Sequence, residues 1–273
     1  MKITVVGPGA MGLLFAGMLS KKHELVLVCR RKEQAQAIQD FKTTTNVRRA
    51  RADLFLLTTK AYDAFDALKQ IRQSHPTTPV LAIQNGLLQF SDENVVRGVT
   101  TYAATRKSDS ESVMTAEGEL LLEKTVFAQN IVMAFHESGV RTEIVGDIDR
   151  FIWEKFFINV GINALGAVTG KKNGELVEDE KLRKRMKALV SEAVLVSKLG
   201  FDEDEVFDKT VLIARNTSKN KSSMLQDVES GRKTEIKFLN DAVCTMGRME
   251  GISTPENKKL VREVKWLEKI NPV

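Results

Sequence analysis

Three polar side chains recur at every fourth position within a segment that is otherwise largely apolar, residues 153–163. They are Lys155, Asn159 and Asn163, and in an α-helix this spacing places them on one face. At a rise of about 1.5 Å per residue the stripe is roughly 12 Å long. Burying an amine and two amides costs free energy unless each has a partner. The stripe therefore predicts a site with a proton donor for a small polar molecule, and the alternative is a face exposed to solvent.

A glycine-rich turn near the N-terminus matches the pattern G-x-G-x-x-G. The turn consists of Gly7, Pro8, Gly9, Ala10, Met11 and Gly12. It follows the β-rich residues Ile3–Val6 and opens an apolar helix-like segment, Leu13–Leu19, which is the context that this pattern needs. The first glycine makes the turn, the second lets a pyrophosphate approach the backbone, and the third allows helix and strand to pack closely. We therefore predict dinucleotide binding, and the alternative is a turn with only a structural role.

The residues after the second predicted strand bear on the choice of dinucleotide. About 20 residues beyond such glycines an NAD enzyme places an acidic residue that holds the ribose 2′-hydroxyl. Here the position reads Cys29-Arg30-Arg31. Guanidinium groups without a carboxylate suit the 2′-phosphate of NADP. The alternative is a solvated arginine pair.

Strands and helices alternate along the first part of the chain. The predicted strands are Ile3–Val6, Leu25–Val28, Leu54–Leu57 and Val80–Ile83. The predicted helices between them are Leu13–Leu19, Lys32–Gln39 and Asp63–Gln73, and a threonine-rich loop precedes the third strand. This alternation predicts an α/β fold, with a Rossmann-type doubly wound parallel sheet covered by helices on both faces.

The strand pattern stops near residue 146. Thr142–Val145 can still finish the sheet as an edge strand, whereas Ile152–Leu165 and Leu182–Leu199 have long helical periodicities. We therefore predict a dinucleotide-binding domain over residues 1–147 and an all-helical substrate domain over residues 148–273. We expect the cofactor cleft to lie between the two domains.

Composition excludes several classes of protein. The chain has 273 residues, of which 42% are hydrophobic, enough for real cores. No uninterrupted apolar run has the length of a membrane span and no signal-peptide pattern opens the chain, so we expect a cytoplasmic protein without a membrane partner. The two cysteines, Cys29 and Cys244, lie far apart and no histidine cluster accompanies them. We therefore expect buried thiols and no metal site.

The charge balance is mildly basic. Lys and Arg number 41 against 36 Asp and Glu, a net charge of +5, which suits anionic small molecules as well as nucleic acid. The densest basic run, Lys181–Lys187, alternates with apolar residues as a solvated helix face would. We therefore expect no nucleic-acid partner, and the alternative for this run is a polyanion site.

Several further motifs join the stripe in a pattern typical of one family. They are Trp153 with Lys155, Asn159 and Asn163; Asn173-Gly174-Glu175-Leu176; Asn220 followed by Ser222 to Asp227; Thr234-Glu235-Ile236; Lys60 within Leu57 to Ala61; and Asn85-Gly86. With these residues the chain resembles the ketopantoate reductases over nearly its whole length. The segments before Lys60 and between Ala104 and Lys155 are shorter than is usual in that family.

The resemblance implies a role for each matching residue. Lys155 would be the general acid, and the substrate would be bound by Asn85, Asn159, Asn163, Asn173, Asn220 and Ser223. The cofactor, NADPH or NADP, would be bound by Gly7, Pro8, Gly9, Ala10, Met11, Gly12, Arg30, Lys60, Asn85, Ala104 and Glu235. Two of these residues have a structural alternative, since Ser223 could cap a helix in a capping box with Gln226, and Glu235 could favour the dipole of a first helical turn.

The resemblance also implies a reaction, the reduction of the C2 carbonyl of ketopantoate by NADPH with a proton from Lys155. A lysine is the logical donor because none of the three histidines falls in a motif. The partner would be a small 2-keto acid, and a homodimer is one assembly that we consider. Two alternatives stay open: a reductase for another branched 2-keto acid, and a non-catalytic dinucleotide-sensing module on the same fold.

Overall fold

A computed structural model describes residues 1–270 of the chain. It divides into two compact units, Met1–Phe151 and Ile152–Val273. The division falls in the first turn of helix α5 (Ile148–Thr169), just after the boundary that the sequence suggests. The last three residues of the expected second domain, 271–273, lie outside the described residues.

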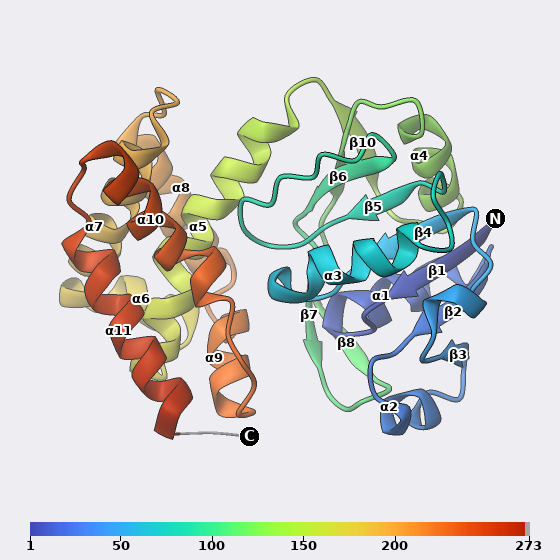
Figure 1. Cartoon of the computed structure of the whole chain (residues 1–273). Coiled ribbons are helices and arrows are strands. Elements are labelled where there is room, and N and C mark those ends of the chain that lie inside the picture. The colour runs from blue at the N-terminus through green and yellow to red at the C-terminus, as the bar shows by residue number, and fades with distance from the viewer. Residues whose placement is uncertain (271–273) are drawn as a thin grey trace. The chain divides into compact units, whose positions relative to one another are not determined.

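The first unit contains an eight-stranded sheet with the order β10-β9-β6-β5-β4-β1-β2-β3 (Figure 1). Its strands are β1 (Lys2–Val6), β2 (Glu24–Val28), β3 (Lys42–Thr44), β4 (Leu54–Leu57), β5 (Val80–Ala82), β6 (Val95–Thr100), β9 (Leu120–Glu123) and β10 (Thr142–Val145). Neighbouring strands are parallel, except that β6 and β9 are antiparallel. The predicted Rossmann-type sheet is confirmed, and so is the expectation that Thr142–Val145 forms an edge strand.

Helices cover both faces of this sheet because alternate residues of its central strands are apolar on each side. Helices α1 (Ala10–Leu19) and α4 (Ala128–Glu137) share one buried cluster with Ile3 and Val5 of β1. On the opposite face Phe55 of β4 meets the ring of His75, which follows helix α3 (Ala61–Arg72). The shorter α2 (Lys32–Ala37) and η1 (Val47–Arg49) flank the edge strand β3.

Two features of this unit differ from the sequence-based expectation. The threonine-rich segment is not only a loop, since Lys42–Thr44 form the edge strand β3 and the Thr44 carbonyl accepts a hydrogen bond from the Cys29 amide (2.9 Å). A separate hairpin of β7 (Ala103–Arg106) and β8 (Ser112–Ala116) packs against α1. These polar strands lack a long β-branched run, so the sequence does not announce them.

The second unit is helical, as predicted. Its elements are α5, α6 (Asn173–Glu178), α7 (Glu180–Ser197), α8 (Glu203–Asn216), α9 (Ser223–Glu229), η2 (Ile236–Phe238), α10 (Asn240–Glu250) and α11 (Pro255–Ile270). Gly161 lets two helices approach the middle of α5, because a Cβ there would lie 2.9 Å from a methyl of Val190 on α7 and 3.0 Å from a methyl of Thr210 on α8. Gly161 lies roughly opposite Asn159 and Asn163 around the helix. The packed face of α5 is therefore the back of the polar stripe.

Length and composition alone would allow α5 to cross a membrane, and 56% of its most apolar window is buried. The core helix of a folded domain passes the same test, and the close packing at Gly161 is of that kind. The basic run on α7 is paired with acidic side chains: Lys184 with Glu180 (2.8 Å) and Lys187 with Asp204 (2.8 Å). The run behaves as the solvated helix face that the sequence suggests.

Candidate active site

The three glycines of the turn differ in what surrounds them. Gly7 has a φ of +88° and a Cβ there would lie 2.7 Å from Thr59, while a Cβ on Gly12 would lie 2.6 Å from the Thr58 hydroxyl. A Cβ on Gly9 would meet only the Gly7 carbonyl oxygen, at 4.0 Å. Gly7 and Gly12 are therefore required by packing, whereas Gly9 leaves open space above the backbone at the start of α1. This cradle fits the pyrophosphate of a dinucleotide.

The ends of β4 and β5 support the turn. The Thr58 hydroxyl donates to the Gly7 carbonyl (2.8 Å), and the Gln84 amide donates to the Leu57 carbonyl (2.7 Å). Lys60 follows at the N-terminus of α3, and Asn85 follows β5. The carboxyl ends of parallel neighbouring strands share one edge of a sheet, so Lys60 and Asn85 lie on the same edge as the glycine-rich turn.

The remaining residues expected to bind the cofactor in the first unit lie on different elements. Ala104 is in β7 and pairs with Met114 of β8. The Arg30 side chain is 79% exposed, and its guanidinium forms an ion pair with Asp63 (3.2 Å) at the start of α3. Arg30 thus lies beside the carboxyl edge of the sheet, in an exposed ion pair that solvent screens.

The polar stripe of α5 is not a solvent-facing surface. Asn163 is 6% exposed, and its amide nitrogen donates to the hydroxyl of Ser223 (3.3 Å). The amide nitrogen of Asn159 is buried and has no hydrogen-bond partner within residues 1–270. A buried donor without an acceptor is costly and typical of a site completed by a ligand. The solvent-facing alternative is therefore wrong.

Lys155 has an unusual electrostatic environment. Burial lowers its pKa to about 8, and the carboxylate of Glu235 opposes that effect by favouring the ammonium form. Glu235 is itself 5% exposed. An amine with a pKa near 8 still carries its proton at neutral pH and releases it more readily than an ordinary lysine. Lys155 can therefore act as a general acid.

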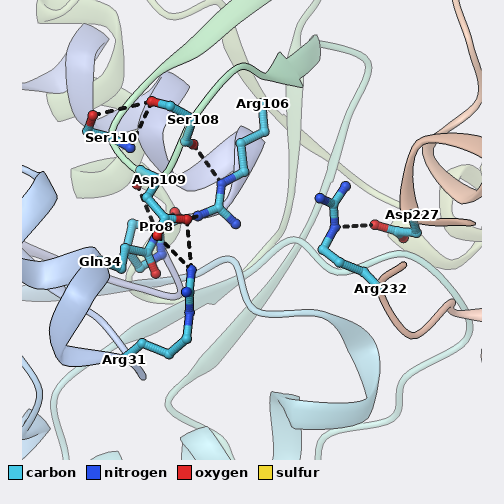
Figure 2. A network of polar contacts seen from close by, with 9 residues as sticks. All are labelled: Pro8, Arg31, Gln34, Arg106, Ser108, Asp109, Ser110, Asp227 and Arg232. Carbon is cyan, nitrogen blue, oxygen red and sulfur yellow. Dashed lines mark hydrogen bonds and ion pairs between the residues drawn. The ribbon is translucent and has the colours of Figure 1, made fainter. Parts of the chain in front are cut away.

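The segment just before Glu235 is held by hydrogen bonds to two helices, α9 and α11. The Arg232 guanidinium donates to the buried carboxylate of Asp227 on α9 (3.1 Å), as Figure 2 shows. The backbone amide and hydroxyl of Thr234 both donate to the carboxylate of Glu268 on α11 (2.8 and 2.7 Å). Glu235 is the N-cap residue of the three-residue helix η2, and its side chain makes no capping hydrogen bond, so any role with a helix dipole concerns this short turn only. The contacts of Arg232 and Thr234 hold the segment that carries Glu235.

The cap of α9 is Ser222 and not Ser223. The Ser222 hydroxyl accepts from the Leu225 amide (3.2 Å) and donates to the Asn163 carbonyl (3.0 Å). The capping box of Ser223 with Gln226 is therefore wrong, because the helix begins one residue earlier than that alternative requires and the Gln226 side chain donates to the Lys221 carbonyl instead (3.0 Å). Ser223 is exposed, which leaves its hydroxyl available beside Asn163.

A second pair of predicted substrate residues meets at the start of α6. The backbone amide of Asn173 donates to the backbone carbonyl of Asn220 (3.0 Å), and the side-chain amide nitrogen of Asn173 donates to the Thr217 hydroxyl (2.9 Å). The side-chain oxygen of Asn173 is buried and has no partner among the described residues. The structure thus joins Asn173 with Asn220, and Asn163 with Ser223.

Comparisons with known proteins agree on one family. The sequence profile described as "Ketopantoate reductase PanE/ApbA" matches residues 3–125, and "Ketopantoate reductase PanE/ApbA C terminal" matches residues 147–268. The chain belongs to the ketopantoate reductase family. The 2-dehydropantoate 2-reductase of Archaeoglobus fulgidus is 28% identical, and the match covers 98% of each chain.

Solved structures extend the likeness within and around this family. A ketopantoate reductase from Ralstonia eutropha JMP134 is 25% identical with a TM-score of 0.88, and the match covers 99% of each chain. A D-mandelate dehydrogenase in complex with NADH is 25% identical with a TM-score of 0.90, again over 99% of each chain. The ketopantoate reductase fold therefore extends over essentially the whole chain.

Some residues that shape this ketopantoate reductase family site carry no sequence signal. Gln34 is buried in α2 and donates to the Pro8 carbonyl of the glycine-rich turn (2.7 Å). Arg106 contacts Asp109 in the loop between β7 and β8, and this aspartate also pairs with Arg31, which the sequence had singled out. Polar residues in a polar segment predict a solvated surface, so only the fold reveals them.

Cys29 and Cys244 are buried free thiols, and burial raises the pKa of both. Within the described part of the chain, no group of three or more His, Cys, Asp and Glu side chains could hold a metal ion. The groups described above for proton transfer are an amine, amides and hydroxyls.

Proposed function

We propose that this chain is an NADPH-dependent 2-dehydropantoate 2-reductase, which reduces the C2 carbonyl of ketopantoate to the alcohol of pantoate. One observation carries the proposal: Lys155, whose pKa is lowered by burial to about 8, shares a helix face with Asn159, whose buried amide nitrogen has no partner among residues 1–270. A proton donor and an unfilled hydrogen-bond donor on one face suit a carbonyl substrate. The family match over nearly the whole chain supports the same reaction.

The first unit would bind the cofactor, which supplies a hydride equivalent to the carbonyl carbon. The open space at Gly9 and the N-terminus of α1 suit the pyrophosphate. Lys60 and Asn85, at the same edge of the sheet, would bind groups farther along the dinucleotide, and Ala104 would line the site from the β7–β8 hairpin. These assignments rest on the fold position of each residue together with the family resemblance.

Lys155 would deliver the proton. As the carbonyl carbon is reduced, negative charge builds on its oxygen, and the Lys155 ammonium would stabilise that charge and transfer its proton to the oxygen. The Glu235 carboxylate favours the protonated amine. The lowered pKa makes the transfer easier, while the carboxylate keeps the donor charged near neutral pH. Burial and the Glu235 carboxylate, which act in opposite directions on this pKa, together suit an acid that must be reprotonated in each catalytic cycle.

The amides and hydroxyls would orient the substrate. The Asn159 amide nitrogen has no acceptor among residues 1–270, and the pair of Asn163 and Ser223 offers an exposed hydroxyl beside a buried amide. The side-chain oxygen of Asn173, next to Asn220, is buried and likewise has no partner in the described part of the chain. Ketopantoate carries a carboxylate that needs donors and a 4-hydroxyl that can donate to an oxygen, so these groups match both ends of the molecule.

The experiment is a turnover assay in which NADPH consumption is followed with ketopantoate and a panel of other 2-keto acids. We expect ketopantoate to have the highest kcat/KM and NADH to be the poorer cofactor. No turnover of any 2-keto acid, with intact dinucleotide binding, would instead indicate the sensing module. The proposal is wrong if another 2-keto acid is reduced far more efficiently.

A second candidate function is a reductase for a different branched 2-keto acid. The likeness to D-mandelate dehydrogenase with NADH, with a TM-score of 0.90, favours it, since the oxidised partner of D-mandelate is phenylglyoxylate. That 2-keto acid has a ring in place of the hydroxylated chain. A panel that includes phenylglyoxylate with both NADH and NADPH distinguishes the two functions directly.

Two further proposals concern the setting of the enzyme. We place it in the cytoplasm, where the buried free thiols Cys29 and Cys244 would remain reduced. We also consider a homodimer, and sedimentation velocity with and without NADPH would measure it. Neither proposal affects the chemistry assigned to Lys155.

A further inference from the structure

In the loop between β7 and β8, the carboxylate of Asp109 lies between two arginine side chains. The Arg31 guanidinium donates to both oxygens of Asp109 (2.7 and 2.9 Å), and Arg106 donates to one of them (2.5 Å). Figure 2 shows the two guanidiniums meeting at this carboxylate. Arg31 is the residue before α2, and Arg106 ends β7. Two elements far apart in the sequence thus build one anion site, and Asp109 fills it.

This anion site adjoins the glycine-rich turn. The amide nitrogen of Gln34, a side chain 7% exposed, donates to the Pro8 carbonyl (2.7 Å) and to the backbone carbonyl of Asp109 (3.2 Å). The Ser112 hydroxyl donates to the Ala10 carbonyl (2.7 Å). The Gln34 side chain therefore bridges the glycine-rich turn and the tip of the hairpin, and the Ser112 side chain binds the hairpin to the first turn of α1.

The site also lies at the end of β2. Cys29, the first residue after that strand, has a pKa of about 11, chiefly because it is buried, and the charges of Asp109, Arg106 and Arg31 act on it as well. In Rossmann-type folds the end of the second strand faces the 2′ position of the adenosine ribose. An anion bound between Arg31 and Arg106 would occupy that region.

We propose that Arg31 and Arg106 bind the 2′-phosphate of NADPH and that Asp109 is an internal anion which this phosphate displaces. The inference rests on the proposed function for the choice of cofactor. A phosphate monoester carries about −1.5 to −2 charge at neutral pH and three acceptor oxygens, against one charge and two oxygens for a carboxylate. It therefore binds two guanidiniums more strongly than Asp109 does.

The same geometry argues against a role for Asp109 as the acceptor of a ribose hydroxyl. An acidic residue that selects NAD offers its oxygens to the 2′-hydroxyl, whereas both Asp109 oxygens accept from Arg31. With NADH bound, Asp109 keeps its arginine partners. With NADPH bound, the phosphate takes them and the hairpin tip is released. Arg30, which pairs with Asp63, adds a more exposed and weaker contact.

The test is calorimetric titration of the full chain with NADPH, NADH and adenosine 2′,5′-bisphosphate, a fragment that contains the 2′-phosphate. Arg106→Ala removes one charged partner, so the two ligands with a 2′-phosphate, NADPH and adenosine 2′,5′-bisphosphate, should bind about 10- to 100-fold more weakly. NADH binding should be nearly unchanged. Asp109→Asn removes the competing carboxylate, so NADPH and adenosine 2′,5′-bisphosphate should both bind several-fold more tightly. Lys107→Ala removes the same charge from the neighbouring exposed position and serves as the matched control.

Arg31→Ala repeats the test from the other side of the site should Arg106→Ala fold poorly, and NADH binding checks the fold of every variant. The inference is overturned if Asp109→Asn weakens NADPH binding, if Arg106→Ala and Lys107→Ala behave alike, or if the unmutated chain binds NADH as tightly as NADPH. Ketopantoate turnover is measured in parallel. If NADPH and NADH respond as expected while ketopantoate is not reduced, the proposed substrate fails and the phosphate site stands.

Discussion

The edge of the sheet in the first unit and the stripe on α5 in the second unit present their polar groups in opposite ways. At the sheet edge, the proposed recognition relies on backbone shape at Gly7, Gly9 and Gly12, and the charged side chain of Arg30 is largely exposed. On α5 the Asn163 side chain is buried, and the buried amide nitrogen of Asn159 has no hydrogen-bond partner among residues 1–270. The sheet edge therefore offers shape to a ligand, whereas α5 offers a buried hydrogen-bond donor that a ligand can satisfy.

This difference teaches where each kind of substitution should act. Adding a Cβ to the turn changes shape, so its effect depends on the space at each glycine. Removing a polar group from α5 relieves a cost of burial, so it should reduce catalysis without reducing stability. Binding sites built from buried, unsatisfied groups commonly trade stability for function in this way.

The largest expected effect is that of Lys155→Ala. General acid catalysis contributes about 10²- to 10⁴-fold, so kcat and kcat/KM for ketopantoate should both fall by at least that range, while NADPH still binds. Lys155→Arg should recover little, because a planar guanidinium does not place a proton where the compact ammonium does. Steady-state kinetics and calorimetry measure the two properties. Turnover within a few-fold of the unmutated enzyme would show that the proton comes from another group.

The paired variants Gly9→Ala and Gly7→Ala test the shape argument. A Cβ at Gly9 meets open space, so the protein should keep its melting temperature while NADPH affinity falls about tenfold or more, a loss of about 1.4 kcal/mol. At Gly7 the positive φ and the contact with Thr59 should cost about 1–2 kcal/mol of stability from φ alone. Thermal melts and calorimetry separate the two. Equal behaviour of both variants would contradict the comparison.

The pH dependence of kcat/KM tests the buried amine. Because the protonated form of Lys155 is the active one, activity should be complete below its pKa and fall as the pH rises through about 8, well below the range of an ordinary lysine. Glu235→Gln removes the charge that raises this pKa, so the falling limb should move to lower pH. Glu235→Asp, which keeps the charge, is the control. A limb that does not move in Glu235→Gln would remove the carboxylate from the mechanism.

The smallest effects are expected for Ser222→Ala and Ser223→Ala, a neighbouring pair with opposite roles. Ser222 caps α9 and donates to the Asn163 carbonyl, so its loss should cost about 0.5–2 kcal/mol of stability. Ser223→Ala should leave the melting temperature unchanged and raise the KM for ketopantoate. If Ser223→Ala lowers only stability, its hydroxyl has no part in substrate binding.

The sequence by itself predicted the local elements well. The glycine-rich turn, the central strands β1, β2, β4 and β5, and the polar face of α5 follow from short-range periodicity and turn chemistry, and the structure has all of them. The role of Lys155 as the acid is implied by the family resemblance, and the position of this lysine in the stripe and the absence of histidine from any motif agree with it. These inferences depend on residues within one or two turns of each other.

Only the tertiary structure decided how distant segments complete the sites. Asp109 reaches Arg31, Gln34 reaches the Pro8 carbonyl, and Glu235 sets the charge beside Lys155. None of these pairs is close in sequence, so the order of residues along the chain does not show that they meet. A pKa or a hydrogen bond depends on the burial and distance of both partners, and these quantities exist only once the chain is folded.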